Sequence, residues 1–254
     1  MWKLFRAVLE KRGLHFFKPQ RLNGKAEFEI NNFSYGVNLP TANYAPWKND
    51  AAFAEIYAAI KNNTLVDIYR CYDLWLLTSE VLKQNSSLNF LEIGVWRGGT
   101  ASVMLKKMQM ENASGTLYLA DTFTGVVKTG AEDTFYTGGE HKDTSIDIVR
   151  NLLEAKKLDK FKLLQGIFPD DTASLIPEGT QFGLCHIDVD VYLSAKGCLE
   201  WVWDKLVVGG IVVFDDYGFH TCDGVTRLVN EQREMKDRVV IYNLNGHGVI
   251  IKIK

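Results

Sequence analysis

The chain has 254 residues, which is enough for one large α/β domain or two small ones with a sizeable core. Its formal net charge of -2 gives no electrostatic reason to expect binding to nucleic acid or to an anionic membrane. No apolar run is long enough to cross a bilayer, and the four cysteines show no paired spacing. We therefore expect a cytoplasmic protein with reduced, buried thiols.

The first 50 residues differ in pattern from the rest. Residues 1–17 are amphipathic and basic but lack the apolar core and cleavage site of a signal peptide. We expect a helix there that docks on the domain or on a partner subunit. Residues 18–50 contain three prolines and are expected to be irregular. We place the domain boundary at residue 50, between an N-terminal extension that serves as a lid or homo-oligomer contact and a domain over 51–254.

From residue 50 onward, helices and then alternating strands and helices are predicted. Asp50 is placed to cap a helix in which Phe53 and Ile56 share one face, and a second helix is expected over 65–83. The later segments share apolar runs with strand character, separated by helical patterns: strands at 88–93, 116–120, 161–164, 182–187, 211–214, 239–242 and 249–253, and helices at 100–110, 144–157, 193–206 and 225–236.

This alternation predicts an α/β fold with a mostly parallel, doubly wound sheet. Only residues 243–248 separate the last two strands, so a hairpin is expected there. The final strand should therefore run antiparallel to its neighbour.

The first strand of the alternating part leads into a glycine-containing turn, Glu92 to Thr100, with the sequence EIGVWRGGT. Such a turn lets a ligand approach the backbone close to the N-terminus of a helix. Its spacing, G-x-x-x-G-G, differs from the dinucleotide pattern G-x-G-x-x-G. The alternative is a tight turn whose glycines only relieve crowding.

Asp121 ends the second strand, where an acid commonly accepts hydrogen bonds from the two hydroxyls of a ribose. The alternative is a turn aspartate, because Asp121-Thr122 followed by Gly125 also reads as the start of a loop. Together with the glycine turn, Asp121 favours a nucleoside-containing ligand. Both NAD and S-adenosylmethionine fit at this point.

Four aspartates follow two further strands: Asp188 and Asp190 after residues 182–187, and Asp215 and Asp216 after residues 211–214. If the strands are neighbours, the four acids meet at one edge of the sheet. Asp188 and Asp190 are expected to point the same way, since side chains alternate along an extended chain. Such a cluster suits a magnesium ion. The alternative is that Asp188 and Asp216 cap the helices that follow.

These segments together resemble the macrocin O-methyltransferase family of magnesium- and S-adenosylmethionine-dependent enzymes, which methylate sugar hydroxyls. The resemblance covers residue 46 to the C-terminus, through Pro46-Trp47, Asn63-Thr64, Arg70 and residues 92–99, 121–125, 166–170, 186–192 and 215–218. It implies the class I methyltransferase fold, a Rossmann-like sheet of seven strands with an antiparallel last strand. It also implies transfer of a methyl group to a hydroxyl of a sugar, glycan or nucleotide-sugar acceptor.

The resemblance assigns roles to individual residues. It implies that Asp188, Asp215 and Asp216 bind magnesium and that Asp190 is the general base. The residues that it places near S-adenosylmethionine are Thr64, Glu92, Gly94, Val95, Trp96, Asp121, Thr122, Phe123, Ser145, Asp170, Asp171 and Asp188. The family often has one aspartate before threonine where this chain has Asp170-Asp171-Thr172, so either acid is a candidate for the contact.

Two other classes of function remain open at this stage. A nicotinamide-dependent oxidoreductase would use the glycine turn and Asp121 but would leave the clustered aspartates unexplained. A non-catalytic carbohydrate-binding protein could keep the same fold.

His141 and His186 are expected to be structural. We expect residues 33–47 and 126–142 to form a lid over the acceptor, with Gly130, Gly138 and Gly139 as hinges; the alternative is dimer contacts or mobile surface.

Overall fold

The computed structural model describes residues 27–38 and 42–254, and its contacts divide the chain into two compact units, residues 1–43 and 44–254. This division lies before residue 50, the expected boundary.

In the first unit, β1 (Phe28–Ile30) and β2 (Phe33–Tyr35) form an antiparallel hairpin. Asn31 and Asn32 adopt positive φ in its turn, as two-residue hairpins require. Irregular structure was expected here, and the hairpin shows that this expectation was wrong for residues 28–35. The helix expected at 1–17 lies outside the described residues.

The second unit begins with a helical turn and two helices. In η1 (Pro46–Lys48), Trp47 packs edge-on against Tyr69 and Tyr72. Asp50 caps α2 (Ala51–Ala59) as predicted, accepting the backbone N–H of Phe53 at 3.0 Å. α3 (Ile68–Gln84) starts after Asp67, whose carboxylate accepts two backbone N–H groups of the first turn. That cap explains why α3 begins later than residue 65.

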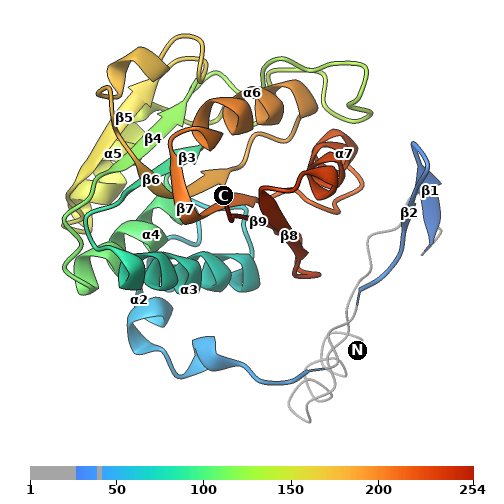
Figure 1. The fold of residues 1–254 in the computed structure, drawn as a ribbon. Helices are drawn as coiled ribbons and strands as arrows, with labels where there is room; N and C mark the ends of the chain where they lie inside the picture. Colours follow the sequence, from blue (N-terminus) through green and yellow to red (C-terminus); the bar gives the residue numbers. More distant parts are fainter. Residues whose placement is uncertain (1–26, 39–41) are drawn as a thin grey trace. The chain divides into compact units, whose positions relative to one another are not determined.

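A seven-stranded sheet forms the centre of this unit, in the order β5-β4-β3-β6-β7-β9-β8 (Figure 1). The strands are β3 (Asn89–Ile93), β4 (Leu117–Asp121), β5 (Phe161–Gln165), β6 (Phe182–Ile187), β7 (Leu206–Phe214), β8 (Arg238–Tyr242) and β9 (Gly248–Lys252). β9 is antiparallel to both β7 and β8, as the hairpin argument predicted. All seven predicted strands are present, and this confirms the expected class I methyltransferase sheet.

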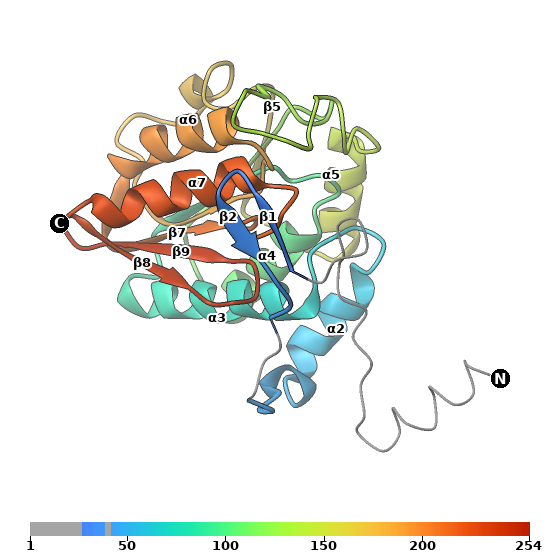
Figure 2. The same cartoon turned by 90° about the vertical axis from the view of Figure 1, so that its right-hand side faces the viewer.

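Helices cover both faces of the sheet (Figure 2). The helices that follow the early strands are α4 (Gly99–Met110) and α5 (Ile146–Ala155), and those that follow β6 and β7 are α6 (Tyr192–Trp203) and α7 (Asp223–Glu231), with the short turns η2 (Ala173–Leu175) and η3 (Gln232–Glu234). α3, α4 and α5 share one apolar core with the sheet, and α6 and α7 share the other. No described helix is long and apolar enough to span a bilayer.

The chain reverses its direction across the sheet at β3. From β3 it proceeds to β4 and β5 on one side and then returns to β6 on the other. Ligands of open α/β sheets bind beyond the carboxyl ends of the strands at such a switch point. This topology puts the glycine turn after β3 beside the aspartates that follow β6.

Candidate active site

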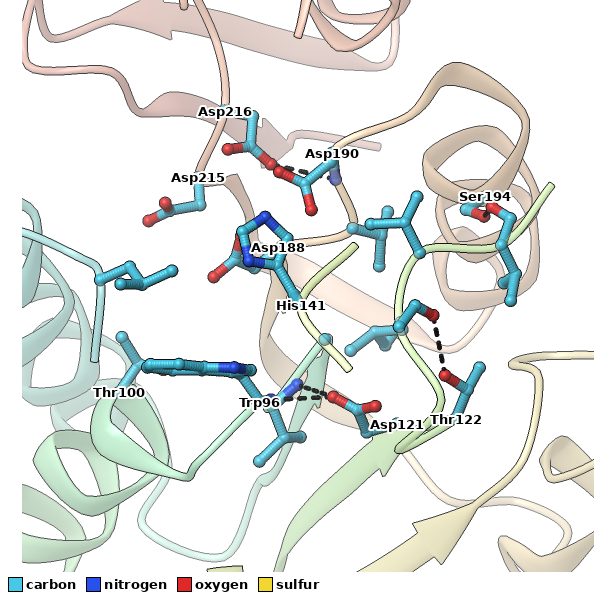
Figure 3. A pocket seen from close by; sticks show the side chains of 18 of the residues that line it. Trp96, Thr100, Asp121, Thr122, His141, Asp188, Asp190, Ser194, Asp215 and Asp216 are labelled. Atoms are coloured by element: carbon cyan, nitrogen blue, oxygen red, sulfur yellow. Dashed lines mark hydrogen bonds between the residues drawn. The ribbon is translucent and has the colours of Figure 1, made fainter. Parts of the chain in front are cut away.

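A cavity of about 260 Å³ opens at the carboxyl ends of β3, β4, β6 and β7 (Figure 3). Most of the residues assigned from the sequence line it: Thr64, Gly94, Val95, Trp96, Asp121, Thr122, Asp188, Asp190, Asp215 and Asp216. These residues come from five separate segments of the chain. The sheet therefore assembles the predicted ligand turn and the predicted acidic cluster into one site.

Five residues that the sequence analysis placed near the cofactor do not line this cavity, and their side chains have other partners. Glu92 is fully buried beside His186, and Phe123 packs into the apolar core. Ser145 caps α5 by accepting the backbone N–H of Ile148.

The two acids after β5 also have structural partners. Asp170 forms an ion pair with Lys128 at 2.7 Å, and Asp171 accepts the backbone N–H of Ile167 at 2.9 Å. Gly166, Ile167 and Phe168 line the cavity instead. Neither acid lines it, so residues 166–168 are the part of this segment that faces the cavity.

The glycine turn is held by Asp121. One oxygen of this carboxylate accepts the backbone N–H groups of Val95 at 2.7 Å and Trp96 at 2.8 Å, and the other accepts that of Phe123 at 2.6 Å. A carboxylate has about four acceptor positions, so one remains for a ligand. Asp121 thus fixes the two loops that it joins, a role that the spacing of the residues did not reveal.

Gly94 brings the glycine turn against the end of β6. It has a φ of +86°, and a Cβ atom at this position would lie 1.6 Å from the backbone oxygen of Asp188. Only glycine satisfies both conditions. The close approach sets the turn next to the acidic cluster.

The aspartates after β6 and β7 form two overlapping groups. One oxygen each of Asp188, Asp215 and Asp216 lie within 4.8 Å of one another, and so do ligand atoms of Asp190, Asp216 and Cys222. Asp190 has a φ of +65°, so the chain is not extended there and side-chain alternation does not apply, although Asp188 and Asp190 both line the cavity. The left-handed turn directs the N–H of Asp190 to Asp216 Oδ2 at 3.2 Å.

The capping alternative for these acids is excluded. α6 starts after Val191 and α7 after Cys222, and neither Asp188 nor Asp216 accepts a backbone N–H from the first turn of either helix. Asp188 and Asp216 are therefore available to the cavity, which they line.

The electrostatic state of the cluster differs from one acid to the next. Burial, together with the repulsion of neighbouring carboxylates, raises the pKa of Asp188 and Asp216 well above the ordinary range. Burial also raises the pKa of Asp190. Burial opposes ionisation of Asp215 as well, but Arg70 and two histidines hold its pKa far below the usual value. Oxygen donors with so much negative charge fit a hard divalent cation such as magnesium.

The sequence analysis missed several residues of the site. Tyr136 lines the cavity, and its hydroxyl is hydrogen-bonded to Asp190 and lies 3.4 Å from Nε2 of His141. His141 also lines the cavity, although it was expected to be structural. The only signal in the sequence was their place in the glycine-containing segment after β4. Phe219 and Cys222, which follow β7, complete the opposite wall.

The segment 126–142 is anchored to the helices beside the cavity. Asp133 accepts the backbone N–H of Tyr192 at 2.9 Å and that of Gly130 at 2.9 Å. Thr134 donates to Asp223 at 3.0 Å. Val126 and Val127 line the cavity, so this segment covers part of it.

Comparison with known proteins identifies the family. The macrocin O-methyltransferase (TylF) family matches residues 59–250. A Streptomyces olivaceus protein named 8-demethyl-8-(2,3-dimethoxy-alpha-L-rhamnosyl)-tetracenomycin-C 4'-O-methyltransferase is 29% identical over 197 residues, which cover 74% of this chain and 74% of that one. Demethyldecarbamoylnovobiocin O-methyltransferase of Streptomyces niveus is 27% identical over 199 residues, covering 72% of this chain and 74% of its own.

Solved structures agree with the fold. The O-methyltransferase NovP superposes with a TM-score of 0.65 at 22% identity, covering 76% of this chain and 83% of its own. The calicheamicin methyltransferase CalS11 superposes with a TM-score of 0.58 at 15% identity, covering 83% of this chain and 94% of its own. With the family match over most of the second unit, the resemblance seen in the sequence is confirmed, and this chain belongs to the macrocin O-methyltransferase family.

Proposed function

We propose that this protein transfers the methyl group of S-adenosylmethionine to a hydroxyl of a sugar acceptor, with magnesium in the aspartate cluster. The observation that carries the proposal is the shared cavity: the glycine turn after β3 and the four aspartates after β6 and β7 line the same space. One relative is named for a rhamnosyl-tetracenomycin, which supports a sugar attached to a larger molecule as acceptor. A solved neighbour is named as a TDP-rhamnose 3'-O-methyltransferase, which supports a nucleotide sugar as acceptor.

The glycine-turn end of the cavity has residues suited to S-adenosylmethionine, and the aspartate end has residues suited to magnesium. Val95, Trp96 and Thr122 would contact S-adenosylmethionine, and the free acceptor position of Asp121 would take a ribose hydroxyl. When bound, this cofactor supplies a methyl group activated by its positive sulfur, so no covalent enzyme intermediate is needed. Asp188, Asp215 and Asp216 would hold magnesium, which when bound supplies a Lewis acid for the acceptor oxygen.

Asp190 is the proposed general base. It lies beside the metal cluster, lines the cavity and has a raised pKa, so it binds a proton more readily than an ordinary carboxylate. The Tyr136 hydroxyl orients the Asp190 carboxylate toward the acceptor. When Asp190 takes the acceptor proton it becomes a neutral carboxylic acid, and burial in this site already favours the neutral form of Asp190.

The segment 126–142 is the proposed lid. It contributes Val126, Tyr136 and His141 to the cavity wall, so it would exclude water from the reacting groups. Residues 33–43 belong to the other unit, and their part in the lid remains a proposal from the sequence. So do the oligomer contact of the N-terminal extension and a cytoplasmic location.

A transfer assay with S-adenosylmethionine labelled on its methyl group tests the function. Deoxysugar-bearing antibiotics, nucleotide sugars and free sugars would be offered in parallel, with magnesium and with a chelator. We expect magnesium-dependent labelling of a sugar hydroxyl and an equal release of S-adenosylhomocysteine. Full activity after exhaustive chelation would refute the metal requirement, and labelling of non-sugar hydroxyls alone would refute the acceptor class.

Calorimetry with NAD addresses the oxidoreductase alternative, which the methyltransferase family match does not support. Binding of S-adenosylmethionine without binding of NAD would dismiss it. A protein that binds the cofactor and sugars but releases no S-adenosylhomocysteine with any acceptor would be a non-catalytic binder.

A further inference from the structure

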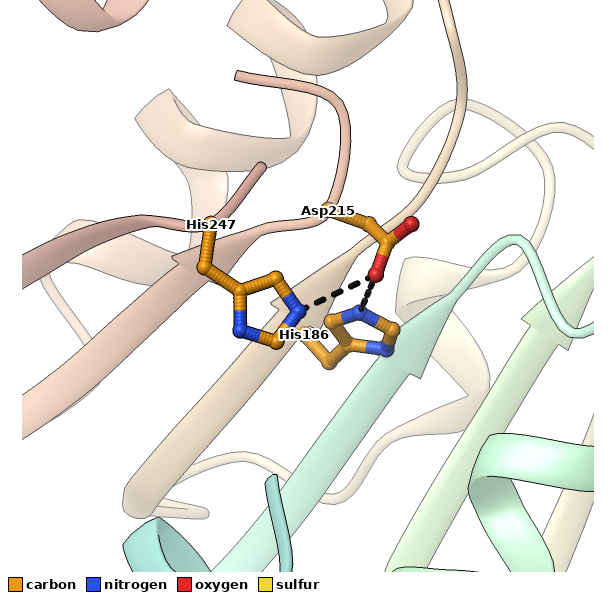
Figure 4. Close-up of side chains that lie close together, drawn as sticks. All are labelled: His186, Asp215 and His247. Atoms are coloured by element: carbon orange, nitrogen blue, oxygen red, sulfur yellow. Dashed lines mark hydrogen bonds and ion pairs between the residues drawn. The ribbon is translucent and has the colours of Figure 1, made fainter. Parts of the chain in front are cut away.

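A buried row of alternating acids and histidines runs beneath the aspartate cluster. His186 Nδ1 lies 2.9 Å from Glu92 Oε1, and His186 Nε2 lies 3.4 Å from Asp215 Oδ1. On the other side, His247 Nε2 lies 3.1 Å from the same Asp215 oxygen, and His247 Nδ1 lies 2.7 Å from Asp73 Oδ2 (Figure 4). Both histidines are fully buried. We call these five residues the histidine row.

The row fixes one carboxylate of the cluster from three directions. His247 is hydrogen-bonded to Oδ1 of Asp215, His186 lies within ion-pair distance of the same oxygen, and the Arg70 guanidinium pairs with Oδ2. Arg70 also donates to the backbone oxygen of Asp215 at 3.2 Å. Arg70 lies on α3, His186 on β6 and His247 in the loop before β9, so separate elements hold this side chain.

The other acids of the cluster have fewer hydrogen-bond and ion-pair partners than Asp215. The N–H of Asp190 is the one backbone donor that the described residues offer to the Asp216 carboxylate. Asp215 is therefore the pre-ordered member of the set, with its charge and orientation established before any ion arrives. Partners of this kind behind a ligand normally control how tightly a site binds its metal.

We propose that His186 and His247 are positioning residues, which hold Asp215 as a preorganised ligand of the divalent cation. The inference rests on the proposed magnesium site and adds to it residues that touch neither acceptor nor cofactor. The outer acids complete the arrangement: Glu92 orients His186, and Asp73 orients His247. The chain of contacts predicts that a change at Asp73, at the far end from the cavity, weakens metal binding through His247.

A second metal ion bound directly by His186, Asp215 and His247 is the competing explanation, because their ligand atoms lie within 4.8 Å of one another. The hydrogen-bonded row is favoured by His247, because both of its ring nitrogens already lie at hydrogen-bond lengths from carboxylate oxygens, 2.7 Å from Asp73 and 3.1 Å from Asp215.

Two variants and a matched control test the row. Asp73→Asn removes the charge behind His247, and His247→Gln removes the imidazole itself. Glu111→Gln is the control, because the Glu111 side chain is 27% exposed and that of Asp73 is 26% exposed, and Glu111 pairs with Lys107 away from the cluster. Magnesium and S-adenosylhomocysteine affinities would be measured by calorimetry on the full chain, purified without a histidine tag, together with its metal content by mass spectrometry.

We expect Asp73→Asn to weaken magnesium binding by about 10-fold and His247→Gln by up to about 100-fold. S-adenosylhomocysteine affinity should stay the same, and the control should match the wild type. Unchanged magnesium affinity in Asp73→Asn, with only a lower melting temperature, would overturn the inference, and this variant serves even if His247→Gln does not fold. A stoichiometric transition metal in the wild type that His247→Gln loses would establish the competing site.

Failure of the proposed function would look different. In that case the wild type and the control would not bind magnesium at all, and Asp216→Asn would change nothing. If the wild type binds magnesium and Asp216→Asn does not, the metal site stands, and the Asp73 and His247 variants alone decide the inference.

Discussion

The two ends of the cavity satisfy their polar groups in opposite ways (Figure 3). At the glycine turn, Asp121 accepts three backbone N–H groups, so the protein itself provides the partners. At the acidic end, Asp188 and Asp216 lie close together, and their pKa values are raised by burial and mutual repulsion. One end is internally complete, whereas the other has excess negative charge.

This difference indicates what each end is built to receive. An internally bonded turn keeps its shape without a ligand and suits an extended organic group that binds through shape and a few hydrogen bonds. A cluster of carboxylates is costly in a buried place unless a cation or protons compensate it. The first end is therefore organised for an organic cofactor and the second for a metal ion and proton transfer.

The largest expected effect is a loss of kcat caused by a change at the acidic end of the cavity alone. Asp190→Asn keeps the size of the side chain but removes its capacity to take a proton, so kcat should fall roughly 100- to 10,000-fold. Affinities for magnesium and S-adenosylmethionine should change little, because Asp190 is not among the proposed ligands of either. Steady-state kinetics with calorimetry separates these quantities. A near-normal kcat would move the base to another residue, with His141 the first candidate.

Substitution of Gly94 should disturb both ends of the cavity at once, because Gly94 of the glycine turn lies directly against the backbone oxygen of Asp188. Gly94→Ala requires a left-handed backbone and a Cβ atom 1.6 Å from the Asp188 oxygen, so we expect destabilisation by more than about 1–3 kcal/mol. Gly179→Ala is the matched control, since Gly179 has a φ of +79° but no atom within 4 Å of the added Cβ. Chemical denaturation measures both. Equal losses in the two variants would show that backbone strain alone, and not the contact between the ends, explains the effect.

Removing one hydroxyl tests how the base is held. Tyr136→Phe loses the hydrogen bond to Asp190, and hydrogen bonds to charged groups contribute about 1.5–3 kcal/mol, so kcat should fall at least about 10-fold. KM for S-adenosylmethionine should remain the same, because Tyr136 is outside the glycine turn. Thr134→Val, which loses the Asp223 contact elsewhere in the same segment, serves as a control for loosening of the loop. If both variants lose activity equally, Tyr136 acts through loop order alone.

The smallest effect concerns pH. The raised pKa values of Asp188 and Asp216 mean that the folded, metal-free protein keeps protons that the unfolded chain releases near pH 4. Its free energy of unfolding should therefore fall as the pH rises above about 4 through those raised values. Magnesium replaces the protons, so the increase in melting temperature that it causes should be larger at about pH 8 than at about pH 5.

Calorimetric scans at several pH values, with and without magnesium, measure this dependence. The Asp216→Asn variant should show a much weaker dependence, because it lacks one of the two carboxylates. A magnesium effect that is independent of pH would contradict the assignment of protons to the cluster.

The strands and the chemistry at their ends could be predicted from local sequence. Apolar runs marked all seven strands, and the short connection 243–248 identified the antiparallel β9. The motif residues Asp121, Asp188 and Asp216 follow such runs, so the order of the chain and the rule of ligand binding at strand ends were sufficient to bring them together. These features depend on neighbours in the sequence.

What the sequence did not reveal depends on contacts between distant segments. Asp190 has a left-handed backbone that no local pattern indicated, and Glu92 faces His186 because β3 and β6 are neighbours. Tyr136 reaches Asp190 only because the segment after β4 is anchored on α6 and α7.

By itself the sequence determined the α/β class, the strand ends that bear acids and the family. Only the tertiary structure decided that Asp215 is paired with Arg70 and His247, whereas Asp188 and Asp216 repel each other without such partners. His247 illustrates the reason: it lies 32 residues from Asp215 in the chain, and antiparallel pairing of β9 with β7 brings the two together. No local pattern specifies such a contact, because it exists only when the sheet is complete.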